Sequence, residues 1–111
     1  MKKAFGFLFV LLQCSLLVSC YSMEKLPKGE LLNTYPSPNE EYQINIYLCD
    51  GGSTTDWSLR GELVECQTQI SKNIYWCYHE KDADVQWVDN ETVMINGRTM
   101  NIHWDVYDWR K

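Results

Sequence analysis

The chain of 111 residues has no phenylalanine after Phe9 and no proline after Pro38. Because all three phenylalanines lie in the first nine residues, the rest of the chain must build its core from tryptophan and tyrosine, which bury roughly 150–250 Å² each. Beyond the N-terminal apolar run, no window of twelve residues shows the apolar spacing of an amphipathic helix. These absences exclude a helical domain and favour an aromatic-rich β structure.

Basic side chains are also scarce, with ten Lys and Arg against fifteen Asp and Glu. Loss of residues 1–19 would remove Lys2 and Lys3, leaving eight basic side chains (ten minus two) and a net charge of −7. Such a surface repels nucleic acid and anionic lipid headgroups, so we expect no nucleic-acid partner. A cationic partner would fit the charge, although acidity that only keeps the domain soluble is the simpler interpretation.

The short motifs of common catalytic and metal sites are absent. There is no Gly-x-Ser-x-Gly nucleophile elbow, no EF-hand loop, and no Cys-x₂-Cys pair of the kind that binds zinc. Cys77 and His79 are two residues apart on one expected strand, where parallel side chains are poorly placed for proton transfer. We expect no catalytic residue, no metal ion and no cofactor.

Two histidines stand beside carboxylates. His79 adjoins three acidic residues within residues 80–84, and His103 lies near Asp105. Alternate carboxylates can bind calcium, but without an accompanying ligand motif they usually form a solvated turn. We therefore interpret residues 80–84 as a charged connection and His103 as a residue on the rim of a strand.

The one long apolar run lies at the N-terminus. Two lysines precede an apolar stretch over residues 4–17, and Leu-Val-Ser-Cys closes it at residues 17–20. A basic region, an apolar run and small residues at a cleavage site form a secretory signal peptide, and Leu-Val-Ser-Cys resembles the bacterial lipobox, whose cysteine is acylated. We predict a lipoprotein signal peptide over residues 1–19 and a palmitate-type lipid anchor on Cys20.

An uncleaved membrane helix is the alternative interpretation. Gln13, Cys14 and Ser15 interrupt the apolar run and leave it shorter than the roughly 20 residues that a spanning helix needs. With a lipid on Cys20, the protein would be held at the cell membrane or the outer membrane, facing the extracytoplasmic side.

Composition divides the remaining chain into a tether and a domain. Prolines, lysines and Gly29 indicate a tether over residues 20–35, which would span about 20 Å if flexible. Residues 36–111 read as one β domain, because apolar residues alternate from Tyr42 onward. The expected strands centre on residues 42–49, 57–64, 74–78, 85–87, 93–95 and 100–104.

These strands predict an all-β fold: a single antiparallel, up-and-down sheet of about six strands, curled or partly barrel-like. Asn96-Gly97 is a strong hairpin signal and favours a type I′ turn. The alternation places Ile74 and Trp76 on the apolar face and Cys49, Cys66 and Cys77 on the opposite face.

Three cysteines follow Cys20, and an extracytoplasmic location permits one bridge among them. Cys66 and Cys77 flank a polar turn over residues 67–72, whereas Cys49 precedes a glycine-rich segment. A hairpin would bring Cys66 and Cys77 onto neighbouring strands, so any disulfide is predicted between these two.

The order of several motifs resembles an uncharacterised family of short bacterial exported proteins, a domain of unknown function common in Gram-positive bacteria. The motifs that carry it are Ser37-Pro38, Tyr42-Gln43-Ile44-Asn45-Ile46-Tyr47, Asp50-Gly51-Gly52, Arg60-Gly61-Glu62-Leu63, Asn73-Ile74-Tyr75-Trp76, Trp87-Val88-Asp89, Val93-Met94-Ile95-Asn96-Gly97 and Tyr107-Asp108-Trp109-Arg110. The chain departs from the family at residues 39–41, where an Asp-Gly turn would be expected. The resemblance supports a single domain and implies no activity.

The C-terminal segment contains the candidate partner-binding residues Tyr107, Trp109 and Arg110, since Trp, Tyr and Arg concentrate at interfaces. The alternative is that Trp109 closes the β core, and we favour that alternative.

We therefore expect a membrane-anchored, non-catalytic binding or scaffolding domain of the cell envelope, whose partner would be an envelope protein. A second hypothesis is an inhibitor or immunity-type lipoprotein that acts on a cationic, secreted, envelope-degrading enzyme. A hydrolase or metal-dependent enzyme is a third class, but the sequence offers no constellation of residues for it.

Overall fold

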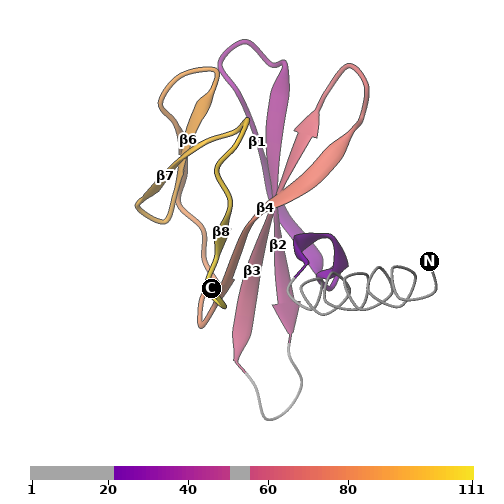
Figure 1. Cartoon of the computed structure of the whole chain (residues 1–111), viewed down its shortest axis with the longest axis vertical. Coiled ribbons are helices and arrows are strands. Elements are labelled where there is room, and N and C mark those ends of the chain that lie inside the picture. Colours follow the sequence, from indigo (N-terminus) through magenta and orange to yellow (C-terminus); the bar gives the residue numbers. More distant parts are fainter. Residues whose placement is uncertain (1–21, 51–55) are drawn as a thin grey trace, which may run out of the picture.

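The computed structural model describes residues 22–50 and 56–111. This part of the chain contains one short 3₁₀ helix and eight strands (Figure 1). They are η2 (Met23–Lys25), β1 (Glu30–Pro36), β2 (Tyr42–Asp50), β3 (Trp57–Glu65), β4 (Ser71–Tyr78), β5 (Val85–Trp87), β6 (Thr92–Ile95), β7 (Arg98–Asn101) and β8 (Tyr107–Asp108). Among these residues no helix has the length and apolar character needed to cross a membrane.

The strands form two sheets. The larger sheet has the order β1-β2-β3-β4-β8, with β8 parallel to β4 and the other neighbours antiparallel, and the smaller sheet has the order β5-β6-β7. The predicted all-β class is confirmed, but the single curled sheet of about six strands is wrong. Residues 79–84 connect β4 to β5 without a tight hairpin, and this connection lets the chain start a second sheet. The predicted Asn96-Gly97 hairpin is present, with φ of 48° and 81° at its two central residues.

The core lies between the two sheets. Ile44, Ile46 and Leu59 of the larger sheet and Val93 and Ile95 of the smaller one are fully buried there. Position 61, on the inner side of the larger sheet, has room only for glycine. A Cβ on Gly61 would lie 2.8 Å from the Cβ of Tyr75 on the neighbouring strand of the same sheet, closer than side chains tolerate, and 3.5 Å from Cδ1 of Ile95 in the smaller sheet.

A β-bulge in β4 reverses part of the predicted alternation. Gly61 pairs with Tyr75 and Glu62 pairs with Asn73, so Ile74 is an extra residue on β4. Beyond the bulge, Tyr75 and Cys77 face the core and Trp76 faces the other side with its partner Arg60. The sequence prediction placed Trp76 on the apolar face and Cys77 opposite, and the bulge is the reason that both assignments are wrong.

The register also separates Cys66 from Cys77. Cys77 pairs with Leu59, whereas Cys66 follows the end of β3 seven residues later, roughly 20 Å along an extended chain. Cys49, Cys66 and Cys77 are free thiols, so the structure does not form the predicted Cys66–Cys77 bridge.

The side of the larger sheet that faces away from the smaller sheet is here called the outer face. Arg60 and Asn73 lie on it, and residues 22–29 cross it, with η2 and the smaller sheet on opposite sides of the larger sheet (Figure 1). Residues 30–36 then form the edge strand β1. From Ser22 onward, therefore, the segment that was expected to be a flexible tether belongs to the folded domain.

Candidate functional site

The three C-terminal residues predicted to bind a partner do not share one surface. Tyr107 stacks on Tyr75, with ring centroids 5.3 Å apart, and lies beneath the guanidinium of Arg98. Trp109 instead stacks on Tyr78 at 5.2 Å and is 43% exposed, so it is not the core residue that we favoured.

Arg110, at the same chain end, forms hydrogen bonds within the chain. Its Nε and Nη2 donate to the buried carboxylate of Asp108 at 2.9 and 2.8 Å. These hydrogen bonds lower the pKa of Asp108 despite its burial. The Asp108–Arg110 pair therefore fixes the chain end instead of presenting Arg110 to a ligand.

A partly buried polar cluster joins the two sheets. The hydroxyl of Tyr75 donates to Glu80 at 2.5 Å, and Arg98 of β7 donates to both Tyr75 (2.9 Å) and Glu80 (3.3 Å). Asn96 adds a further hydrogen bond to Glu80 at 2.9 Å. Burial raises the pKa of Glu80, but the hydrogen bonds from Tyr75, Asn96 and Arg98 outweigh it and lower the pKa overall.

Glu80 is therefore not part of a solvated turn, as the sequence suggested, but a link between β4 and the β6–β7 hairpin. Its neighbour His79 points outward and places Nδ1 2.8 Å from Asp56. Cys77 lies in the core, where burial raises the pKa of its thiol. The two residues weighed as a nucleophile and its base thus lie in different environments, one buried and one exposed.

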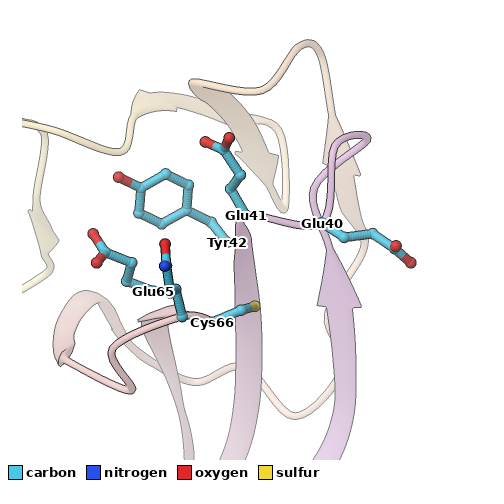
Figure 2. Close-up of a pocket in the computed structure, with 6 residues that line it drawn as sticks. Glu40, Glu41, Tyr42, Glu65 and Cys66 are labelled. Carbon is cyan, nitrogen blue, oxygen red and sulfur yellow. The ribbon is translucent and has the colours of Figure 1, made fainter.

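The second histidine cluster leads to the strongest candidate site. His103 lies 3.6 Å from Glu91 and contacts the ring of Tyr42 edge-on at 6.1 Å. Tyr42 lines two adjoining hollows at the end of the molecule formed by the β1–β2, β3–β4 and β5–β6 turns. Figure 2 shows the Tyr42 ring between Glu41 and Glu65.

These hollows define what we call the acidic end. The first, of about 530 Å³, is lined by Glu40, Glu41, Tyr42, Glu65, Cys66 and Gln67. The second, of about 400 Å³, is lined by Asn39, Glu41, Tyr42, Asp89, Asn90, Glu91 and His103. Five carboxylates thus line the two hollows that share Tyr42, and neither hollow has a lysine or arginine in its lining.

Hydrogen bonds between the turns hold this arrangement. The backbone N–H of Asn39 donates to Asn90 of the β5–β6 turn at 2.8 Å, and that of Cys66 donates to the carbonyl of Glu41 at 2.9 Å. Buried Ser37 receives the N–H of Tyr42 at its hydroxyl, which fixes the start of β2. Hydrogen bonds therefore fix the backbone that carries these carboxylates.

Several negative charges of the acidic end act on the hydroxyl of Tyr42. Partial burial raises the pKa of its hydroxyl, and the negative charges of Glu65, Glu41 and Glu91 raise it further. Burial disfavours a charge of either sign, but the negative charges of these three glutamates favour positive charge near Tyr42.

Exposed apolar side chains flank the acidic end. Ile70 is 70% exposed and lines a third, smaller hollow of about 260 Å³ together with Tyr42 and His103. Trp104, next to His103, is 74% exposed. Exposed tryptophan is a residue type that is frequent at protein interfaces.

Within residues 22–50 and 56–111, no group of three His, Cys, Asp or Glu side chains is placed to hold a metal ion. The acidic end itself was missed from the sequence, because its carboxylates come from three separate turns. The only signal for it was the excess of acidic residues, which gives no location.

A protein-family model described as a family of unknown function (DUF5412) matches residues 4–111. The match covers nearly all of the chain, which therefore belongs to this family. No curated protein and no solved structure matches the chain. The resemblance to an uncharacterised family is confirmed, while bacterial origin and export remain predictions.

Proposed function

We propose that this member of the DUF5412 family is a lipid-anchored, extracytoplasmic protein of the bacterial cell envelope. Its β domain would bind a cationic protein through the acidic end, without catalysis. The lipid would be carried by Cys20, which lies outside the described residues, and the support for it is the Leu-Val-Ser-Cys sequence at residues 17–20. Removal of the signal peptide would leave a mature chain with a more negative net charge and so favour such a partner.

The observation that carries the binding proposal is the lining of the two adjoining hollows. Five carboxylates and Tyr42 form it, and no basic side chain of the lining neutralises them. Complementary charge speeds encounter and selects partners of the opposite sign. Trp104 and Ile70 supply apolar contact area at the edge, which charge alone would not provide.

An inhibitor of a cationic, envelope-degrading enzyme is a narrower form of the same proposal. Exposed Trp104 beside the hollows favours it, because a protruding aromatic next to complementary charge can occupy a cleft in an enzyme. Loss of the partner's enzymatic activity on binding would separate an inhibitor from a scaffold.

The anchor is tested by Cys20→Ala in the full chain. We expect the variant to stay unprocessed or to leave the membrane fraction, because acylation needs the cysteine. Labelled palmitate incorporated by the variant as strongly as by wild type would reject the anchor.

The binding site is tested by photo-crosslinking in the membrane-bound full chain. A photoreactive amino acid at position 104 should crosslink a basic protein, and the yield should fall at least about tenfold when Glu41→Gln and Glu65→Gln are combined. The control combines Asp82→Asn and Asp84→Asn, two exposed carboxylates outside the acidic end, and should crosslink like wild type. Equal loss in both variants, or a yield insensitive to added salt, would contradict an electrostatic site.

A further inference from the structure

The N-terminal segment is fixed to the outer face by hydrogen bonds to its backbone. Asn73 donates to the carbonyl of Met23 at 2.6 Å, and Arg60 donates to the carbonyl of Lys28 at 2.7 Å. Arg60 is itself buried and stacks over the ring of Tyr47 at 3.9 Å. Residues 22–28 therefore lie on the sheet as an outermost layer.

Because residues 22–28 are held on the sheet, they do not form a flexible tether. Cys20 is two residues before Ser22, and two extended residues reach at most about 7 Å. A flexible tether over residues 20–35 would instead have allowed about 20 Å. A lipid on Cys20 would thus hold the outer face within a few ångströms of the headgroups.

We propose that the outer face, at residues 22–31, docks on the lipid surface and orients the domain on the membrane. This inference rests on the lipid anchor of the proposed function and adds a second, protein-borne contact. The smaller sheet lies on the opposite side of the larger sheet and would face away from the bilayer (Figure 1).

The charge of the segment allows a lipid surface as the occupant. Lys25 and Lys28 are exposed, and the exposed carboxylates of Glu24 and Glu30 balance them, which gives residues 22–31 no net charge in a chain that is otherwise acidic. Arg60 adds no free charge, because Glu62 lies 3.6 Å from it. Basic residues next to a membrane anchor are attracted by the negative surface potential of a bilayer.

An apolar side chain lies beside these lysines. Leu31 pairs with Tyr47 and so belongs to the outer face, where it is 51% exposed. An exposed leucine close to these lysines in sequence can enter the headgroup boundary, as the apolar side of an interfacial segment does. The position beside the anchor, the absence of net negative charge and the exposed leucine thus favour a bilayer as the partner of this face.

The experiment measures which lysines the membrane protects. The lipidated full chain is placed in vesicles containing about one third phosphatidylglycerol, treated with a water-soluble acylating reagent, and analysed by mass spectrometry. Lys25 and Lys28 should be labelled at least about threefold more slowly than in neutral detergent micelles. Lys81 and Lys111, which are exposed outside residues 22–31, should be labelled equally in both.

Two matched variants sharpen the result. Leu31→Asp should reduce the protection of Lys25 and Lys28 at least about twofold, whereas Ile70→Asp, an exposed residue near the acidic end, should leave it unchanged. Flotation with the vesicles without selective protection would overturn the docking while leaving the anchor in place, and failure to float would overturn the anchor itself. Protection that also appears in detergent and rises with protein concentration would assign the face to a second copy and reject the lipid.

Discussion

The two faces of the larger sheet are covered in different ways. The inner face packs Ile44, Ile46 and Leu59 against the smaller sheet with almost no exposed area. The outer face carries Arg60 and Asn73, and its cover includes one segment held by hydrogen bonds to its carbonyls. Apolar burial contributes most of the stability of such a domain, whereas directional hydrogen bonds fix where a segment lies.

This difference indicates that the stability of the domain and the position of its N-terminal segment can be altered separately. A change on the inner face should unfold the whole domain, because both sheets share that core. A change on the outer face should release the N-terminal segment first, since two of its backbone carbonyls depend on hydrogen bonds from Asn73 and Arg60.

The largest effect is expected on the inner face. Ile46→Ala should destabilise the domain by about 2–5 kcal/mol, the range for removing a fully buried branched side chain. Val88→Ala, at an exposed position, is the control and should change stability by less than about 0.5 kcal/mol. Urea unfolding followed by tryptophan fluorescence measures both, and similar midpoints for the two variants would show that the core is not between the sheets.

The next effect concerns the polar cluster between the sheets. Arg98→Met should cost about 1.5–3 kcal/mol at neutral pH, because Glu80 and Tyr75 lose a charged hydrogen-bond donor. The pKa of Glu80 is lowered in the folded state, so its stabilisation is present above the ordinary glutamate value of about 4.3 and is lost as the pH falls through the folded-state pKa. The difference between wild type and variant should therefore shrink in acid, and a constant difference from pH 7 to pH 3 would contradict the role of Glu80.

This cluster also shows which features of the structure could not be predicted from the sequence alone. The alternation at Ile44, Ile46 and Leu59 predicted the β class and most of the inner face, because period-two burial is a local signal. Glu80 and Arg98 are eighteen residues apart and meet only after the second sheet folds over the first. Their pairing depends on topology, which a local pattern does not encode.

The bulge at Ile74 was invisible for a similar reason. An extra residue in one strand shifts every later side chain to the other face, and only the register with Gly61 shows it. Strand β1 was missed because its residues are mostly exposed at a sheet edge and show no clean alternation. The carboxylates of the acidic end come from three turns, and only the pairing of the strands brings those turns together.

A smaller loss of stability is expected at Trp109, which covers Tyr78 of β4. Because Trp109 keeps much of its surface exposed, Trp109→Ala should cost about 1–2 kcal/mol, less than the 3–5 kcal/mol for a fully buried ring. Trp104→Ala removes the same side chain from a position that is 74% exposed and should leave the melting temperature nearly unchanged. A larger loss at position 104 than at 109 would reverse this assignment.

The smallest global effect, and the sharpest test of the two faces, is expected at Asn73. Asn73→Ala removes the hydrogen bond to the carbonyl of Met23, a contribution of about 0.5–1.5 kcal/mol. Because residues 22–28 open before the core, amide exchange of this segment should quicken several-fold while exchange in β3 stays the same. The control is Asn33→Ala on exposed β1, whose side chain accepts only from the adjacent Thr34. If Asn73→Ala quickens exchange equally in the segment and in β3, the outer-face segment is part of the global folding unit and cannot be released by itself.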